Sequence, residues 1–443
     1  FKQKTAYEIG VRLVGSEMCI RDRYVGKKVE LRGWVYNTRS IGKIWFLILR
    51  DGTGLLQCVA VKDETHDESF ALEQSLNKED SVIVTGIVRK EARAPGGFEL
   101  SLQTINVVNH VADEYPISSK EHGPDFLMSN RHLWLRSKRQ HAIMRVRHQI
   151  IKAIRDFFDN NGFTLIDSPV FTGNSVEGTT TLFELEYFGR QAYLTQSGQL
   201  YQEAGAMAFG KTYCFGPAFR AEKSKTRRHL TEFWMVEPEI AYCDIEENMD
   251  WAEKLVVAII ERVLKNCFDE LVILERDISK LQTVIPPFPR ITYDEAAKIL
   301  EKHGNGFQYG KDFGGTDETV LSGQFEKPVM IHRWPAEIKA FYMKRDEDNP
   351  ELSLGVDMLA PEGFGEIVGG GQREDDLEIL MKRIRYHDLP LKPFQWYLDL
   401  RKYGSVPHSG FGLGLERTVG WICGTKHIRE TIPFPRTMSR LDP

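Results

Sequence analysis

The chain has 443 residues, of which 42% are hydrophobic, and a formal net charge of -5. At about 150 residues per domain this length predicts two to three domains. The acidic balance excludes a generally basic nucleic-acid coat, so any RNA contact must come from local basic patches. Six cysteines without a Cys-x-x-Cys pair argue against a disulfide framework or a structural zinc site and fit a reducing compartment. The longest apolar run, Leu255–Ile260, is far too short to span a membrane.

The first 23 residues show no clear periodicity and no cleavage pattern. They resemble a translated sequencing adapter, so we predict a non-native or disordered extension over residues 1–23 and exclude it from the fold reasoning. The alternative is a genuine, weakly structured extension. If the segment is an artefact, the natural N-terminus is lost, and any transit peptide would be lost with it. We predict a cytoplasmic location, and import into an organelle stays open because a transit peptide could have been lost.

Residues 24–112 contain five short runs of strand-forming residues separated by turn residues. Five such strands predict a small β-barrel, for which an OB-fold is the best fit. Basic and aromatic side chains are interleaved along the first two runs: Arg32, Trp34, Arg39, Lys43, Trp45, Phe46 and Arg50. This pattern suits single-stranded bases stacked beside a phosphate-neutralising surface. It equally suits aromatic filling of a barrel core, and the sequence leaves both interpretations open.

The remainder divides into a linker and a large second domain. Residues 113–136 are polar and contain two prolines and a glycine, which predicts a linker or hinge. Residues 137–160 place apolar side chains at helical spacing, and residues 163–171 are predicted to form a strand. Further strands are predicted at 181–188, 192–194, 212–219, 233–242, 329–333, 340–343, 352–359 and 366–369, with a helix at 249–267. Strands that outnumber helices and meet through hairpins predict an α+β domain with a large antiparallel sheet.

The most informative segment is 215–241, in which two strand-like runs flank a basic loop. Arg220 and Glu222 precede the loop, and His229 and Phe233 follow it. An arginine, a carboxylate and an aromatic ring around one hairpin suit a nucleoside triphosphate, because they can meet its phosphate, its adenine amino group and its base. The glycine-rich segment 410–424 adds Arg417. Together the two segments resemble motifs 2 and 3 of class II aminoacyl-tRNA synthetases, and the surrounding sequence resembles the asparaginyl enzymes.

The resemblance implies an ATP site with two catalytic arginines. Arg220 would contact the α-phosphate and the amino-acid carboxylate, and Arg417 would neutralise the γ-phosphate. His229 would contact the β- and γ-phosphates, while Phe233 stacks on adenine and Glu222 accepts from its amino group. The implied ATP-binding residues are Arg220, Glu222, His229, Phe233, Glu366, Gly414, Glu416 and Arg417. Without the family, the alternative for the hairpin is an exposed loop with a solvated charge run, and its basic residues either contact the tRNA acceptor end or are ordinary surface.

Residues 193–204 resemble the loop that closes over the substrate in aspartyl and asparaginyl enzymes. Aspartyl enzymes carry a lysine where this chain has Gln202, which is followed by Glu203. A carboxylate there would repel aspartate and accept hydrogen bonds from an amide NH2, while Arg373 would donate to the side-chain carbonyl oxygen. The implied asparagine-binding residues are Glu177, Ser197, Gln199, Glu203, Glu237 and Arg373. Taken singly, each is equally well an ordinary polar surface residue.

Asp357 and Glu366 are the predicted Mg²⁺ ligands. Paired carboxylates beside a triphosphate suit a cation that takes few protein oxygens and several from phosphates. The resemblance favours Glu366, which lies seven positions before Arg373. In the barrel, Phe46 and Gln57 match positions that stack on and read the anticodon in the aspartyl and asparaginyl group, and Glu99 is predicted to act likewise.

The resemblance covers residues 24–443 and implies an OB-fold anticodon-binding domain at 24–112, a hinge at 113–136 and a class II catalytic domain at 137–443. The helix and strand at 137–171 resemble motif 1 and imply a homodimer. The implied activity is ATP-dependent ligation of L-asparagine to tRNA-Asn through an asparaginyl-adenylate, with release of AMP and pyrophosphate. The alternatives are an aspartyl-tRNA synthetase, including one that also charges tRNA-Asn, and a non-catalytic RNA-binding relative.

Overall fold

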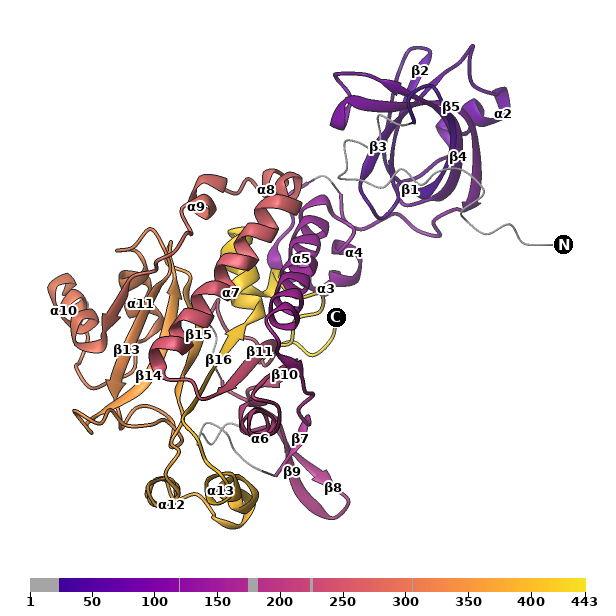
Figure 1. Ribbon diagram of the computed structural model, residues 1–443. Coiled ribbons are helices and arrows are strands. Elements are labelled where there is room, and N and C mark those ends of the chain that lie inside the picture. The colour runs from indigo at the N-terminus through magenta and orange to yellow at the C-terminus, as the bar shows by residue number, and fades with distance from the viewer. Residues whose placement is uncertain (1–23, 119, 174–181, 224–225, 305) are drawn as a thin grey trace. The chain divides into compact units, whose positions relative to one another are not determined.

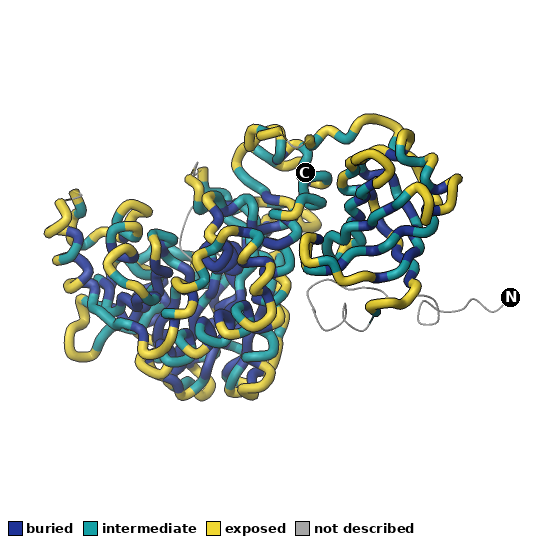
Figure 2. Tube along the Cα trace, turned by 90° about the horizontal axis from the view of Figure 1, so that it is seen from above, coloured by how far each residue is buried: buried dark blue, intermediate teal, exposed yellow. Residues whose placement is uncertain are grey.

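The computed structural model describes residues 24–118, 120–173, 182–223, 226–304 and 306–443. The chain divides into two compact units, Phe1–Gly123 and Pro124–Pro443, and each is described by itself. In both units the buried residues run through the interior and the exposed residues lie mainly in turns and connecting loops (Figure 2). Among the helices of the described ranges, none combines the length and apolar character needed to cross a membrane.

The first unit is a closed five-stranded barrel, in agreement with the sequence prediction (Figure 1). Its strands are β1 (Lys28–Ile41), β2 (Ile44–Arg50), β3 (Leu55–Val61), β4 (Ser81–Lys90) and β5 (Phe98–Asn109), with a short helix α2 (Asp67–Phe70) and 3-10 turns at Ala71–Gln74 and Pro95–Gly97. The order around the barrel is β1-β2-β3-β5-β4, and only β3 and β5 run parallel. The barrel closes because β1 is long enough to pair with both β2 and β4.

The alternation of side chains in the barrel separates the two interpretations of its aromatic residues. Trp45, Leu47 and Leu49 of β2 point into the core and are at most 1% exposed. Successive residues of a strand point to opposite faces, so Phe46 lies on the outer face of the same strand. Trp34 is 40% exposed. The aromatic residues are therefore divided, with Trp45 filling the core and Trp34 and Phe46 on the outside.

The second unit is built on an eight-stranded sheet in the order β12-β13-β14-β15-β16-β11-β10-β6. Only β6 with β10 and β12 with β13 pair in parallel, so the predicted antiparallel sheet is confirmed. The strands are β6 (Thr164–Leu165), β10 (Lys211–Phe219), β11 (Glu232–Ala241), β12 (Arg290–Thr292), β13 (Val329–Pro335), β14 (Leu352–Ala360), β15 (Gly365–Gln372) and β16 (His408–Gly414). A small second sheet contains β7 (Phe171–Thr172), β8 (Glu184–Tyr187) and β9 (Arg190–Leu194).

Helices cover this sheet. They are α3 (Pro124–Ser129), α4 (Arg131–Trp134), α5 (Lys138–Asn160), α6 (Gln199–Phe209), α7 (Ile245–Asn266), α8 (Phe268–Ile273), α9 (Ile278–Gln282), α10 (Tyr293–His303), α11 (Gly315–Ser322), α12 (Leu377–Tyr386), α13 (Gln395–Lys402) and α14 (Leu415–Cys423), with 3-10 turns at Lys392–Phe394 and Ile428–Glu430. The main core lies where α5, α7 and α14 pack on the central strands, and α5 and α7 lie side by side there (Figure 1). Helices α12 and α13 form a separate apolar cluster next to α6.

Three sequence predictions differ from the observed elements. Residues 124–136, placed in the hinge, form α3 and α4 of the second unit, because the buried Arg131 donates to the backbone carbonyls of Ile432 and Pro433. The predicted strand at 163–171 is two short strands, since only its ends find partners in two different sheets. Residues 340–343 do not form a strand. Only Met343 pairs, through a single bridge to the residue that follows β15.

Candidate functional site

Two neighbouring cavities lie over the central strands of the second unit and share Arg220, Met235, Glu366 and Gly412 in their walls. The first has a cavity volume of about 90 Å³ and the second of about 440 Å³. All the residues predicted to bind ATP line the first cavity: Arg220, Glu222, His229, Phe233, Glu366, Gly414, Glu416 and Arg417. The structure therefore brings residues nearly 200 positions apart to one cavity.

The hairpin between β10 and β11 places Arg220 against Phe233. The backbone N–H of Arg220 donates to the Thr231 carbonyl at 3.0 Å, which continues the antiparallel pairing beyond the last strand residue. The Arg220 guanidinium then lies over the Phe233 ring, 5.5 Å from its centroid. Burial lowers the pKa of His229, and the positive charges of Arg417 and Arg220 lower it further. The imidazole is therefore neutral at neutral pH, next to two arginines.

Arg417 is carried by the first turn of α14, directly after β16. Its Nη1 donates to the backbone carbonyl of Glu366 at 3.0 Å and to the Glu366 carboxylate at 2.9 Å, which ties α14 to β15. Although burial opposes ionisation, Arg417 and Lys339 hold the pKa of Glu366 below its usual value. This edge of the cavity thus presents an arginine and an ionised carboxylate together.

Glu416 lines the cavity, but its carboxylate is used within the protein. It forms an ion pair with Arg147 of α5 at 2.7 Å and accepts from the backbone N–H of Trp234 at 2.9 Å. Burial raises its pKa despite Arg147. Glu416 therefore joins α5, β11 and α14 and supports the wall that the other predicted ATP residues share.

The second cavity is lined by Ser197, Gln199, Glu237 and Arg373, four of the residues predicted to bind asparagine. The Ser197 hydroxyl donates to Glu237, whose other oxygen accepts from the backbone N–H of Gly198 at 2.8 Å. This arrangement fixes the start of α6 against β11. It presents a buried carboxylate and a hydroxyl beside Arg220, which suits an amino-acid ammonium and carboxylate.

Glu203 is not placed at the cavity wall, and the predicted direct contact with the substrate amide needs correction. Its carboxylate is fully buried and accepts from Arg401 at 2.6 Å, from Tyr397 at 2.8 and 2.9 Å, and from Gln199 at 3.1 Å, with His408 Nε2 at 3.0 Å. The reason is helical geometry. Gln199 and Glu203 share a face of α6, but Glu203 lies one turn further along the helix, where its side chain is buried in the interior and not at the cavity. Gln202 donates instead to the Ile166 carbonyl.

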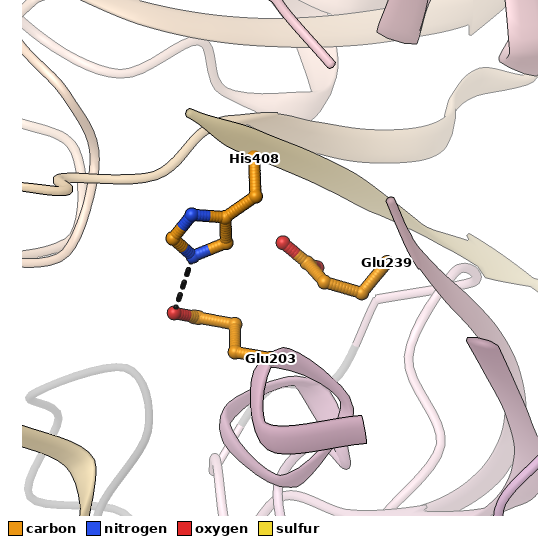
Figure 3. A group of neighbouring side chains, drawn as sticks. All are labelled: Glu203, Glu239 and His408. Atoms are coloured by element: carbon orange, nitrogen blue, oxygen red, sulfur yellow. Dashed lines mark hydrogen bonds and ion pairs between the residues drawn. The ribbon is translucent and has the colours of Figure 1, made fainter. Parts of the chain in front are cut away.

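Arg373 has a buried partner that sequence reasoning missed. Its guanidinium donates to both oxygens of Glu239, at 2.9 Å each, and both side chains are at most 2% exposed. Glu203, Glu239 and His408 lie close together (Figure 3), within the spacing of a metal site, and none of them lines either cavity. Each carboxylate, however, is already neutralised by an arginine, so the cluster is a polar network rather than a metal centre.

The predicted metal ligands Asp357 and Glu366 both line the second cavity. A methyl group built on Gly369 would lie 2.7 Å from a Glu366 oxygen and 3.5 Å from an Asp357 oxygen, so both carboxylates point at the same space. Lys339, which the sequence did not single out, donates to Asp357 at 2.6 Å and covers the Trp334 ring. Two converging carboxylates beside arginines that are predicted to bind phosphate fit a divalent cation.

In the barrel, the three residues predicted to contact the anticodon face outward. Gln57 and Glu99 are register partners on β3 and β5, and their side chains are hydrogen-bonded at 3.1 Å. Arg39 lies over the Phe46 ring, 4.6 Å from its centroid. The remaining prediction, Glu177, lies outside the described residues.

The sequence left open whether the residues of the basic loop have a specific role or are ordinary surface. Among those that the structure describes, Arg228 has the most clearly defined contacts. It donates to Glu318 of α11 at 3.1 Å, to Thr319 at 2.7 Å and to the carbonyl of Gly363. The loop is thereby fixed to α11 beside the first cavity, which Arg228 lines. No local signal separates Arg228 from its basic neighbours, because its partners lie 90 to 135 positions away in the sequence.

The chain matches two family models that correspond to its two units. Residues 123–438 match the tRNA synthetases class II (D, K and N), and residues 29–108 match the OB-fold nucleic acid binding domain. The asparagine–tRNA ligase of Sorangium cellulosum is 59% identical over 432 residues, covering 95% of this chain and 97% of that protein. The corresponding ligase of Desulforamulus reducens is 57% identical over 421 residues, covering 95% and 98%.

Solved structures agree with these matches. The asparaginyl-tRNA synthetase of Pyrococcus horikoshii complexed with asparaginyl-adenylate is 45% identical, with a TM-score of 0.92 over 95% of this chain and 97% of that one. A putative aspartyl-tRNA synthetase from Leishmania major is more distant, with 27% identity and a TM-score of 0.85 over 100% and 97%. The fold and the two-part site thus define a class II aminoacyl-tRNA synthetase. Within that class the chain belongs to the asparagine–tRNA ligase family.

Proposed function

We propose that the chain ligates L-asparagine to tRNA-Asn at the expense of ATP, through an asparaginyl-adenylate, and releases AMP and pyrophosphate. The observation that carries this proposal is the junction of the two cavities at Arg220, which puts a nucleotide site and a small polar site side by side. An α-phosphate bound at that junction would lie next to an amino-acid carboxylate, as adenylate formation requires.

The first step needs little proton chemistry. The α-carboxyl group of an amino acid has a pKa of roughly 3.5, so it is already ionised at neutral pH and can attack the α-phosphorus without a general base. Its oxygen forms the new bond to phosphorus as the bond to the pyrophosphate oxygen breaks. Arg220 would stabilise the charge that develops on the α-phosphoryl oxygens, and Arg417 and His229 would hold the departing pyrophosphate.

Asparagine would be held through its three polar ends. Glu237, held in position by Ser197, would accept from the ammonium group, and Arg220 would meet the carboxylate. Arg373, fixed by Glu239, would donate to the side-chain carbonyl oxygen. Glu177 is retained as a proposed part of this site on the family resemblance alone.

We propose Asp357 and Glu366 as the residues that hold Mg²⁺. When bound, the cation would neutralise phosphate charge and orient the pyrophosphate for in-line departure. The proposal is supported by the two carboxylates, which face one space beside Arg417. Lys339 supplies a positive charge at the same place by pairing with Asp357.

The activity should need more Mg²⁺ below neutral pH. Burial, aided by Glu366, raises the pKa of Asp357 to about 7 even though Lys339 opposes the shift. Below pH 7 the carboxyl is protonated and must release a proton to bind a cation, whereas above pH 7 it is ionised. The Mg²⁺ concentration for half-maximal ATP–pyrophosphate exchange is therefore expected to be about tenfold higher at pH 6 than at pH 8. Asp357→Asn is expected to flatten this dependence, and an unchanged pH dependence in that variant would contradict it.

The outer face of the barrel is proposed to bind the anticodon through Phe46, Gln57 and Glu99. Phe46→Ala should weaken tRNA-Asn binding by about tenfold, because one stacked base contributes roughly 1–3 kcal/mol. The measurements are the KM for tRNA in aminoacylation and the rate of ATP–pyrophosphate exchange, which should not change. Val108→Ala, at a 63% exposed position of β5, is the matched control. Equal effects of both substitutions on the KM for tRNA would refute a specific role for Phe46.

The main test is ATP–pyrophosphate exchange with asparagine and with aspartate separately. Exchange that depends on asparagine and not on aspartate is the expected result. Exchange with aspartate would indicate an aspartyl or non-discriminating enzyme, and no exchange with either would indicate a non-catalytic relative. We also propose a homodimer that forms through α5 and the strands that follow it, and a cytoplasmic location. The mass of the purified protein in solution tests whether it is a homodimer.

A further inference from the structure

Helix α13, outside the central sheet, contributes one arginine to the buried cluster that contains Arg373. The Arg401 side chain is fully buried. Its Nη2 donates to Glu203 at 2.6 Å and to the Tyr397 hydroxyl at 3.1 Å, and its Nε donates to the backbone carbonyl of Glu374 at 2.8 Å. Glu374 directly follows Arg373 in the chain. Arg401 therefore contacts Glu203 on α6, next to the proposed site, and also the backbone that carries Arg373.

The same network fixes Arg373 from two further directions. The backbone N–H of Arg373 donates to the carbonyl of His408 at 2.9 Å, and the His408 ring lies 3.0 Å from Glu203. On the other side Glu239 holds the Arg373 guanidinium with two hydrogen bonds. Of these residues only Arg373 lines the cavity, so the others act on a ligand through it or through the charge that they contribute.

The charges of the network balance. Arg373 is paired with Glu239, and Arg401 is paired with Glu203, which makes two positive and two negative groups in one buried cluster. In a water-poor site an unbalanced charge acts strongly on a nearby ligand. A neutral cluster offers Arg373 as a hydrogen-bond donor to a side-chain carbonyl without a surplus positive charge that would favour a second carboxylate.

We propose that Arg401 is a positioning residue for asparagine selection, which holds Arg373 through Glu203 and the Glu374 backbone and keeps the buried cluster neutral. The inference rests on the proposed asparagine site and extends it to α13. It predicts different effects for the substitution of Arg401 and for the substitution of Glu203. Loss of Arg401 releases Arg373 and leaves a surplus negative charge, whereas loss of the Glu203 charge leaves a surplus positive one.

The first test replaces Arg401 and compares the KM for asparagine with the KM for ATP in ATP–pyrophosphate exchange. Arg401→Met is expected to raise the KM for asparagine about tenfold or more, since it removes hydrogen bonds that involve charged groups. The KM for ATP should stay within about twofold, because Arg401 does not line the ATP cavity. Arg401→Lys should recover part of the loss by restoring the charge.

The control is Arg383→Met on the adjacent helix α12. Arg383 is also a buried arginine, but it donates to Glu337 and to the Ala336 carbonyl. It should leave the KM for asparagine within about twofold. Parallel increases in both KM values for Arg401→Met, or an equal increase in the control, would show a general packing role and overturn the proposal.

The second test uses Glu203→Gln and measures exchange with aspartate relative to asparagine. A surplus positive charge should raise the relative use of aspartate by about tenfold, while Arg401→Met should lower it. If Arg401→Met does not fold, Tyr397→Phe removes only the hydroxyl that contacts Glu203 and should raise the KM for asparagine by a smaller factor. Glu203→Gln without any change in the aspartate-to-asparagine ratio would overturn the charge argument. Wild-type protein without asparagine-dependent exchange would instead refute the proposed function itself, and this inference with it.

Discussion

Arg220→Ala is expected to lower the rate of asparagine-dependent ATP–pyrophosphate exchange by about 100- to 1,000-fold. Arg220 lies where the cavities proposed for ATP and for asparagine meet, and it is proposed to stabilise the charge that develops on the α-phosphoryl group. Removing one preorganised donor to such a charge costs a factor of this order. The effect should appear mainly in kcat, because the interaction strengthens as the transition state forms.

The structure supplies a control for this prediction on the same hairpin. Arg227 is exposed and does not line either cavity at the junction, so Arg227→Ala should exchange at close to the wild-type rate. The thermal unfolding temperature should be similar for both variants, since the Arg220 side chain lines a cavity and is not part of the apolar core. A kcat within threefold of wild type for a folded Arg220→Ala protein would exclude Arg220 from the chemical step.

Glu239→Ala is expected to lower the free energy of unfolding by about 3–5 kcal/mol and to abolish asparagine-dependent exchange. The loss leaves Arg373 buried without its bidentate partner, and an uncompensated buried charge has a cost of this order. Urea denaturation followed by fluorescence measures the first effect. The second follows because Arg373 would no longer be held toward the cavity.

A double replacement separates stability from function at this pair. Glu239→Leu combined with Arg373→Met removes both charges and should recover most of the stability, because buried ion pairs are often replaced by apolar side chains without loss. It should not recover exchange, since the proposed donor to the substrate is gone. Recovery of exchange in the double variant would show that Arg373 has no part in binding asparagine.

The predictions that held best came from patterns within short stretches of chain. The barrel strands were visible in the alternation around residues 44–50, where Trp45, Leu47 and Leu49 turn inward. The hairpin around Arg220 and Phe233 was also local, and its register is fixed by the pairing of two adjacent strands. The hinge was drawn too long because the buried Arg131 binds carbonyls some 300 positions further on.

The features of the molecule fall into two groups, those that neighbouring residues predict and those that depend on packing between distant elements. The sequence by itself determined the barrel and the antiparallel sheet, because strand alternation is readable from neighbouring residues. The residues predicted to bind ATP came from the family resemblance, and they line one cavity. Only the tertiary structure decided that Glu203 is turned away from the cavity, that Glu239 holds Arg373, and that Arg401 joins them from 198 positions away. The physical reason is that buried charges are stable only with partners, and packing between distant elements selects those partners.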